Sequence, residues 1–424
     1  MNAVKEKKKI GLTTRIFIAL IAGAIVGIAL NMFAADVDFV QNVLVNGIFY
    51  VVGQGFIRLM QMLVVPLVFC SLICGATAIG DSKTLGKVGV KIIGFYIFTT
   101  MMAVAVALGI GLLIKPGMGL DMSQIQTAEV AASSDSVSFA ETLLNIIPKN
   151  PIGALANGEM LQVIVFALIV GVILAKLQDK TQLVTNFFQQ GNDIMMEMTM
   201  MVMGLAPIGV FCLMADVVAV NGAKIVGSLA LVVGVAYIGY ILHVIIVYGC
   251  SIKFLSGMSP IAFFKGLAPA MLTAFTTTSS NATLPINIEC CNEMGAEPEI
   301  SSFVLPLGAT INMDGTAIYQ AVCAVFIACC YGVDLTLGQM AMIVLTATLA
   351  SVGTAGVSGA GMIMLSMVLM SVGLPVEGIA IIAGVDKLFD MGRTTLNITG
   401  DATAAMWVSK VCLLYTSDAA DDLI

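Results

Sequence analysis

The stretch from Leu307 to Cys330 reads LGATINMDGTAIYQAVCAVFIACC and places an aspartate, Asp314, inside a run apolar enough to cross a lipid bilayer. A carboxylate at the centre of a membrane helix costs about 2.5 to 3.5 kcal/mol of insertion free energy. Asn312 and Thr316 add further polar groups beside it. Because nothing in simple packing offsets such a penalty, the cluster indicates a functional site within a membrane.

The composition of the whole chain indicates a membrane protein. Of its 424 residues, 59% are hydrophobic and 11% are charged, and the mean hydropathy is +1.03. That leaves too little polar surface for a water-soluble globule of this length. The apolar runs often exceed the roughly 20 residues of a helical span and lack the alternation of a membrane barrel, so we expect an all-α integral membrane protein. The net charge of −7 speaks against nucleic acid as a partner.

The lysines predict the orientation of the chain. Two groups of lysines flank the first two predicted spans: Lys5, Lys7, Lys8 and Lys9, then Lys83, Lys87 and Lys91. Cytoplasmic segments are enriched in lysine and arginine, so we expect a cytoplasmic N-terminus and an inner (plasma) membrane location. In the loop between Lys115 and Lys149 all charged residues are acidic, so we expect this loop on the outer side of the membrane. The first apolar run is too long for a signal-peptide core, so we expect it to remain as a span.

Eight spans and two interrupted segments account for the apolar runs. The spans are expected near residues 12–33, 45–78, 86–114, 158–176, 192–218, 224–256, 300–332 and 376–410. The interrupted segments, 259–291 and 337–372, contain AFTTTSSNATLP and ASVGTAGVSGAGMIML. Backbone groups freed at membrane depth need partners, so two such segments favour re-entrant hairpins in an inverted repeat. The alternative is that each is an ordinary helix with a small-residue packing face.

The last predicted span carries the densest polar chemistry. Its residues 386 to 407 read DKLFDMGRTTLNITGDATAAMW. With a period of 3.6 residues, one stripe of this helix would hold Asp390, Arg393, Thr394, Asn397 and Asp401. A buried ion pair alone would explain an arginine beside an aspartate. The stripe offers more polar groups than one arginine needs, which favours a ligand site.

Four motifs resemble a known family in order and spacing: TTSSNATLP, LPLGATINMDGTA, SVGTAGVSGAG and DMGRTTLNITGD. The chain is similar to the dicarboxylate/amino acid:cation symporters, the glutamate/aspartate transporter family. The resemblance covers residues 1–410 as a single transporter unit and implies a homotrimer with an elevator-type mechanism. It implies a fixed scaffold (about 12–78 and 158–218) and a moving transport domain (about 86–114 and 224–410, with both hairpins). We interpret residues 411–424, VCLLYTSDAADDLI, as a non-native tail.

The resemblance implies that sodium ions are co-transported and that oxygen ligands hold them, as hard cations require. One implied sodium site joins Asp314 to Tyr96, Thr99 and Thr100. A second consists of Gly308, Asn312, Asn397 and Asp401. A third joins Thr310 to Ser351, Val352 and Thr354.

The resemblance also implies the substrate contacts. Arg393 would grip the side-chain carboxylate of an acidic substrate with two nitrogens, and Asp390 would receive its ammonium group. The remaining implied pocket residues are Ser280, Thr316, Val357, Gly361, Thr394 and Asn397. Relatives carry a second arginine near this aspartate, at positions occupied here by Thr278 and Met391. Lys387, one turn before Asp390, either replaces that charge or faces lipid or water.

These observations predict a secondary active symporter that imports aspartate or glutamate with sodium, surrounded by membrane lipids. A proton-coupled C4-dicarboxylate symporter is the alternative within the same fold, although Asp401 and the set of Tyr96, Thr99 and Thr100 argue against it. An intramembrane enzyme with Asp314 and Asp390 as an acid pair is the alternative from another class; because no nucleophile or metal cluster accompanies them, we expect no enzyme. His243, the only histidine, is interpreted as a packed, hydrogen-bonded side chain, and the ten cysteines as packing residues.

Overall fold

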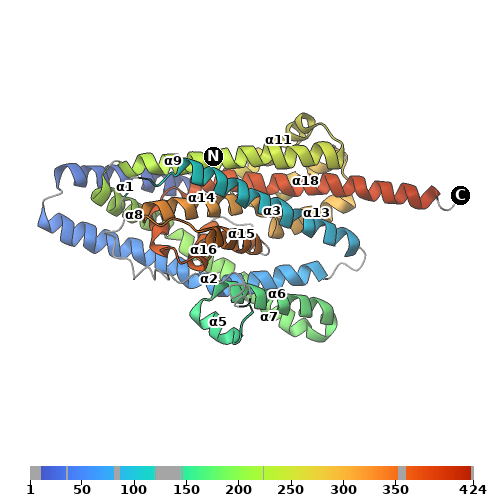
Figure 1. The fold of residues 1–424 in the computed structure, drawn as a ribbon, viewed down its shortest axis with the longest axis horizontal. Coiled ribbons are helices and arrows are strands. Elements are labelled where there is room, and N and C mark those ends of the chain that lie inside the picture. Colours follow the sequence, from blue (N-terminus) through green and yellow to red (C-terminus); the bar gives the residue numbers. More distant parts are fainter. Residues whose placement is uncertain are drawn as a thin grey trace, which may run out of the picture.

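A computed structural model describes residues 11–34, 37–80, 86–118, 120, 144, 147–222, 224–351 and 360–421. Regular structure within these ranges is helical throughout, without a strand, which confirms the all-α prediction. The helices form an elongated bundle, and the long C-terminal helix projects from one end (Figure 1).

The first half of the chain forms the outer helices of this bundle. Its elements are α1 (Leu12–Phe33), the π-helix η1 (Val40–Phe49), α2 (Tyr50–Gly80), α3 (Gly86–Ile114), α5 (Pro151–Asn157), α6 (Met160–Leu177), the 3-10 helix η2 (Gln178–Thr181), α7 (Gln182–Gly204) and α8 (Ala206–Asn221). Helix α1 packs along α8, and α2 packs against α6, α7 and α8. The predicted span 192–218 is divided at Leu205, after which Pro207 lies in the first turn of α8. Proline is tolerated there because that turn has no intrahelical acceptor for its missing N–H.

The second half forms the core and the candidate site. Its elements are α9 (Lys224–His243), the π-helix η3 (Val244–Tyr248), α10 (Gly249–Ser251), the π-helix η4 (Ile252–Ser256), α11 (Pro260–Thr277), α12 (Ser280–Glu293), α13 (Pro298–Ile311), α14 (Asp314–Cys330), α15 (Leu337–Ser351), α16 (Ala360–Ser371), the 3-10 helix η5 (Val376–Gly378), α17 (Ile379–Ala383) and α18 (Asp386–Asp421). Helix α14 contacts α3, α9, α15, α16 and α18, and its residues are almost all buried.

The predicted interruption of segment 259–291 is present. Helix α11 ends at Thr277, and Thr278 adopts the left-handed conformation with φ 54°. Ser279 then caps α12, because its hydroxyl accepts a hydrogen bond from the amide of Ala282 at 3.3 Å. In the second segment, α15 and α16 lie on either side of residues 352–359, which are outside the described residues. The re-entrant character of both hairpins stays a prediction.

Six described stretches are long and apolar enough to cross a membrane: Thr14–Phe33, Val40–Thr77, Lys91–Ile114, Gln162–Gly204, Ile225–Ser256 and Ile300–Cys330. They support a multi-pass membrane protein, while the number of eight spans stays a prediction. Two predicted spans, 192–218 and 376–410, have no stretch of their own among these six, for physical reasons. The predicted fifth is divided at Leu205, and α18 begins only at Asp386 with charged side chains in its first two turns.

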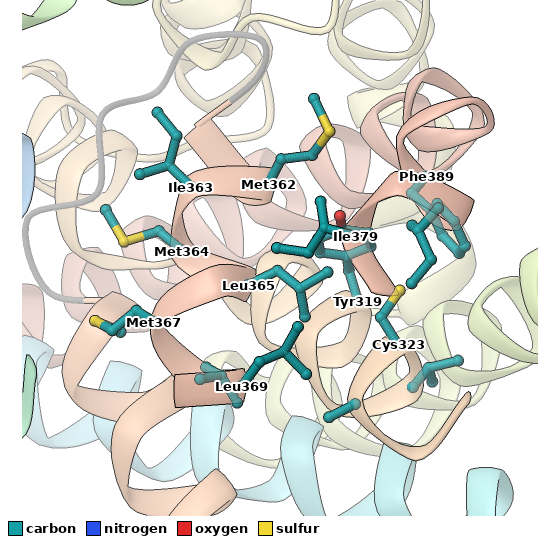
Figure 2. Packing of buried hydrophobic residues seen from close by; sticks show 14 of the residues in the cluster. Tyr319, Cys323, Met362, Ile363, Met364, Leu365, Met367, Leu369, Ile379 and Phe389 are labelled. Carbon is teal, nitrogen blue, oxygen red and sulfur yellow. The ribbon is translucent and has the colours of Figure 1, made fainter. Parts of the chain in front are cut away.

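Aromatic and aliphatic side chains tie α14 to the helices that carry the candidate site. Tyr319 and Cys323 of α14 face Phe389 of α18 and Ile379 of α17, with side chains of α16 beside them (Figure 2). The rings of Tyr319 and Phe389 lie 5.0 Å apart, within the usual range of an aromatic pair. This packing fixes α14 and α18 side by side. The division into scaffold and transport domain stays a prediction.

Candidate functional site

A break in the helix places the polar residues of the opening stretch. Helix α13 ends at Ile311, α14 begins at Asp314, and Asn312 between them has an extended backbone. The amide of Asn312 donates to the carbonyl of Gly308 at 2.8 Å, closing the last turn of α13. Other carbonyls of a final helical turn lack intrahelical donors, so a broken helix exposes oxygen ligands inside the fold. The polar residues of the opening stretch therefore lie at a break within the predicted span 300–332.

Asp314 lies at the centre of the first predicted cation site. Its Oδ1 accepts a hydrogen bond from Thr100 Oγ1 at 2.6 Å, and its Oδ2 accepts one from Tyr248 at 2.7 Å. His243 Nε2 lies 3.1 Å from the same Oδ2. The structure thus joins Asp314 to Thr100 of α3, as predicted. Tyr96 and Thr99 are buried on the same helix, although the Thr99 hydroxyl lies within hydrogen-bond distance of the Tyr96 carbonyl.

Asp401 lies at the centre of the second predicted cation site. Asn312 donates from Nδ2 to Asp401 Oδ1 and to the carbonyl of Asn397, both at 3.0 Å. Gly308 faces the same place: a Cβ there would lie 2.5 Å from Asp401 Oδ1 and 2.7 Å from the hydroxyl of Tyr96. A side chain at this position would have to displace these two polar groups, which glycine leaves in place. Gly308, Asn312, Asn397 and Asp401 are therefore brought together, as predicted.

The chemistry of this second cluster fits a small hard cation. Asn312 Oδ1 and the Tyr96 hydroxyl are buried without a hydrogen-bond partner in the described structure. Asp401 is buried as well, and no lysine, arginine or histidine of the described residues forms an ion pair with it. A buried carboxylate normally has a counter-charge. These oxygen atoms, with no sulfur or imidazole among them, are ligands that sodium accepts.

Asn397 links the break in α13–α14 to the substrate stripe. Its Oδ1 accepts a hydrogen bond from the amide of Gly315 at 2.8 Å, which satisfies a free donor of the first turn of α14. Its Nδ2 lies 3.1 Å from the sulfur of Met313 and 3.5 Å from the hydroxyl of Thr316. Asn397 thus contacts both predicted sites, Asn312 through its backbone carbonyl and Thr316 through its side chain.

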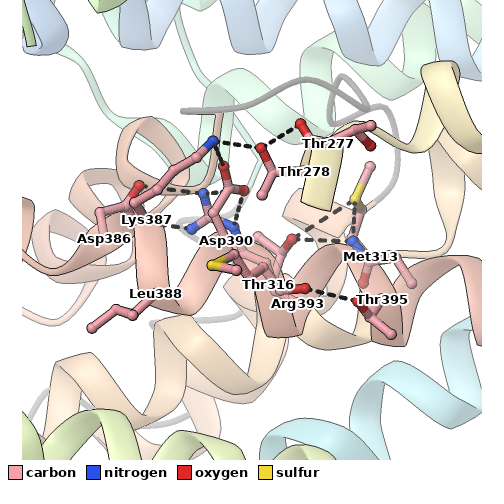
Figure 3. A network of polar contacts seen from close by, with 12 residues as sticks. Thr277, Thr278, Met313, Thr316, Asp386, Lys387, Leu388, Asp390, Arg393 and Thr395 are labelled. Carbon is pink, nitrogen blue, oxygen red and sulfur yellow. Dashed lines mark hydrogen bonds and ion pairs between the residues drawn. The ribbon is translucent and has the colours of Figure 1, made fainter. Parts of the chain in front are cut away.

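Arg393 is the centre of the predicted substrate site. Its Nε donates to Asp390 Oδ1 at 2.9 Å, and its terminal nitrogens face Asp386 at 3.1 and 3.4 Å (Figure 3). The guanidinium carbon lies 4.8 Å from the centre of the Tyr319 ring, a cation–π contact that holds its plane. All four side chains are buried.

Lys387 lies inside this network. Its Nζ forms an ion pair with Asp390 Oδ2 at 3.2 Å and donates to the hydroxyl of Thr278 at the break between α11 and α12 (Figure 3). The side chain of Lys387 is 8% exposed. This position favours the interpretation as a compensating charge over a lysine that faces lipid or water. The contact also places the first hairpin next to α18.

The structure describes only some of the remaining predicted substrate residues and of the residues predicted for the third cation site. Ser280 is the buried first residue of α12, Thr394 is buried on α18, and Gly361 packs against a terminal nitrogen of Arg393. Thr310, predicted for the third cation site, is exposed, and its hydroxyl donates to the carbonyl of Leu307 at 2.9 Å. The side chain of Ser351 and the whole of Val352, Thr354 and Val357 lie outside the described residues.

Three side chains of these clusters were not predicted as site residues. Asp386 lies two helical turns before Arg393, on the stripe that we began only at Asp390. His243 is packed and hydrogen-bonded as predicted, but its partner is Asp314, 71 residues later in the chain. Tyr248 lies in the π-helix η3, a helical irregularity frequent at functional sites, which sequence periodicity does not reveal.

Comparisons with known proteins show which chains this one is similar to. Residues 12–411 match the model of the sodium:dicarboxylate symporter family. The chain is 36% identical over 409 residues to the proton/sodium-glutamate symport protein of Geobacillus stearothermophilus, covering 95% of both chains. It is 36% identical over 412 residues to the proton/glutamate-aspartate symporter of Escherichia coli (strain K12), covering 95% of this chain and 93% of the relative. Excitatory amino acid transporter 3 of Mus musculus is 31% identical over 447 residues, covering 93% and 85%.

Proposed function

Because the chain belongs to the sodium:dicarboxylate symporter family, we propose that it is a secondary active symporter that carries aspartate or glutamate across a membrane together with sodium. The observation that carries this proposal is Arg393, a buried guanidinium beside the buried carboxylate of Asp390. Arginine can bind a side-chain carboxylate through two nitrogens, and an aspartate can receive an ammonium group. An acidic amino acid carries both groups.

The cation clusters support coupling to sodium. Asp314 with Thr100, and Asp401 with Asn312 and Gly308, would each hold one ion as cargo. The third proposed site, between Thr310 and Ser351, Val352 and Thr354, rests on the resemblance of the motifs alone. The side chains proposed to complete the substrate pocket are Ser280, Thr316, Val357, Gly361, Thr394 and Asn397.

Uptake by purified protein in proteoliposomes tests the function directly. We expect labelled aspartate and glutamate to accumulate when sodium is outside, and not when sodium is equal on both sides. Succinate, serine and alanine should accumulate far less. Uptake of succinate driven by a proton gradient without sodium would instead establish the proton-coupled dicarboxylate symporter.

The assembly and movement of the carrier are part of the proposal. A homotrimer in a plasma membrane, with a cytoplasmic N-terminus and an elevator-type transport domain, follows from the family motifs and from the distribution of lysines. Cross-linking of the protein in native membranes would give trimers if this assembly is right. Monomers alone would contradict it.

Lys387→Met should weaken substrate handling because Asp390 would lose one of the two cations that neutralise it. Breaking a buried ion pair leaves an uncompensated charge, so we expect the KM for aspartate to rise by at least about tenfold. Uptake kinetics in proteoliposomes measure this change. Lys387→Arg keeps the charge and should stay near the wild-type value.

A second substitution on the hairpin separates charge compensation from packing. Thr278 contacts Lys387, and an arginine there tolerates the left-handed backbone at least as well as the β-branched threonine. Lys387→Met combined with Thr278→Arg should therefore recover most of the lost affinity; Lys387→Met combined with Met391→Arg tests the other position used by relatives. A Lys387→Met carrier with wild-type kinetics would show that Asp390 is balanced in another way.

A further inference from the structure

Both edges of the Arg393 guanidinium are bound by carboxylates of the protein itself. Nε and one terminal nitrogen, Nη2, hold Asp390 Oδ1 at 2.9 and 2.8 Å. Nη1 and Nη2 hold the two oxygens of Asp386 at 3.1 and 3.4 Å (Figure 3). A guanidinium has five N–H groups, and four of them are used in these contacts. Among the described residues, these contacts leave one N–H of Nη1 over.

A substrate carboxylate therefore cannot bind Arg393 through two nitrogens while Asp386 holds its edge of the guanidinium. Two-pronged binding of a carboxylate requires one whole edge of the guanidinium, with two parallel N–H groups. The edge formed by Nε and Nη2 binds Asp390, the residue that the proposed function assigns to the ammonium group of the substrate. The other edge is the one that Asp386 occupies. The substrate carboxylate can bind this edge only after Asp386 has dissociated from it.

Asp386 also balances the net charge of the buried network around Arg393. The network contains two cations, Arg393 and Lys387, and two carboxylates, Asp386 and Asp390, so its formal charge is zero. Without Asp386 the same buried network would carry one uncompensated positive charge. Buried charges are tolerated when paired and are strongly unfavourable when unpaired. Asp386 thus neutralises the charge of Arg393, as the carboxylate of a bound substrate would.

Position at a helix start does not account for these contacts. Asp386 is the first residue of α18, and acids favour helix N-termini because of the helix dipole. That effect needs no arginine two turns away. The carboxylate instead reaches along α18 with both oxygens on Arg393, on the face covered by Tyr319. The geometry is that of a two-pronged ion pair between Asp386 and Arg393.

We propose that Asp386 is an internal substitute for the side-chain carboxylate of the substrate. It binds Arg393 while the carrier is unloaded, and an acidic substrate displaces it. This inference rests on the proposed function. It has two consequences: Asp386 lowers the apparent affinity for substrate, and it keeps the Arg393 network neutral while the unloaded carrier returns across the membrane. Asp386 is a positioning residue that sets affinity and the return step.

The test compares net uptake with exchange in proteoliposomes. Net uptake requires the unloaded carrier to return, whereas exchange of internal unlabelled aspartate for external labelled aspartate does not. In Asp386→Asn we expect the KM for exchange to fall by about tenfold, net uptake to fall by at least about tenfold, and the maximal exchange rate to stay near the wild-type value. A merely structural defect would lower net uptake and exchange together.

Two further variants keep the test decisive. Asp386→Glu retains a carboxylate and should retain both net uptake and exchange, whether or not the asparagine variant folds. Glu289→Gln removes an exposed acid of α12 and should leave both rates unchanged. Equal net uptake and exchange in Asp386→Asn, equal loss of both in folded protein, or a glutamate variant that exchanges without net uptake would each overturn the role of Asp386. Wild-type protein that takes up neither acid would instead reject the proposed function.

Discussion

Replacing Arg393 with cysteine should abolish sodium-driven uptake of aspartate and glutamate. The substitution removes the only group of the network that can bind a side-chain carboxylate through two nitrogens. Loss of a buried ionic partner amounts to about 3 to 5 kcal/mol, so kcat/KM for both acids should fall by at least about 100-fold. Neutral amino acids such as serine or alanine should gain uptake, because they need no such partner. Competition assays with labelled substrates measure both changes.

The fold must be controlled in this experiment, because Asp386 and Asp390 would be left with Lys387 as their only cation in the network. Arg393→Cys combined with Asp386→Asn restores the charge balance and is the matched background. Thermal unfolding of the purified proteins shows whether the site stays intact. Unchanged aspartate and glutamate transport in either variant would remove the basis for the assignment of Arg393.

A functional site around Asp314 could be predicted from sequence because its physics is local. A carboxylate and an amide in an apolar run are costly on a membrane helix, so a functional role followed directly, whereas the break at Asn312 is seen only in the structure. The same holds for the polar stripe of α18, which periodicity alone gave from Asp390 to Asp401. Asp386 was not predicted because it lies seven positions before Arg393, beyond the first residue of the predicted stripe. Only the side-chain geometry shows that its carboxylate reaches Arg393.

Contacts between distant segments could not be predicted from the residues themselves. Tyr248 and His243 meet Asp314 across 66 and 71 residues of chain, and their position depends on π-helical turns that widen the spacing of side chains. Likewise, only the packing of the first hairpin on α18 brings Thr278 to Lys387. The family motifs supplied which residues belong together, whereas the structure supplies the atoms that connect them.

One continuous set of contacts joins the cation clusters to the substrate network. Asn312 holds Asp401 and the carbonyl of Asn397, and the Asn397 side chain holds the first turn of α14. The backbone of Arg393 packs so closely on Gly315 in that turn that no Cβ would fit. A cation that orders the break would therefore order the pocket as well. If the proposed sites are right, these contacts would couple cation binding to substrate binding.

Asp401→Asn should show this coupling as a joint loss of sodium and substrate affinity. Asparagine has the size of aspartate, and its Oδ1 can still accept the hydrogen bond from Asn312, so the geometry is kept while the counter-charge is lost. We expect half-saturating sodium to rise by about tenfold or more. Since linked sites change each other by the same factor, substrate affinity at fixed sodium should fall in proportion.

The measurement is substrate binding to purified protein, titrated over a wide range of sodium concentrations in wild type and Asp401→Asn. Glu293→Gln, which removes an exposed acid of α12, is the matched control and should reproduce the wild-type curves. If the charge of Asp401 acts through sodium, the two proteins should approach the same substrate affinity at saturating sodium. A deficit that persists at every concentration would indicate damage to the pocket itself. Identical curves would show that Asp401 is not part of a cation site, because a buried carboxylate that binds sodium cannot lose its charge without shifting the titration.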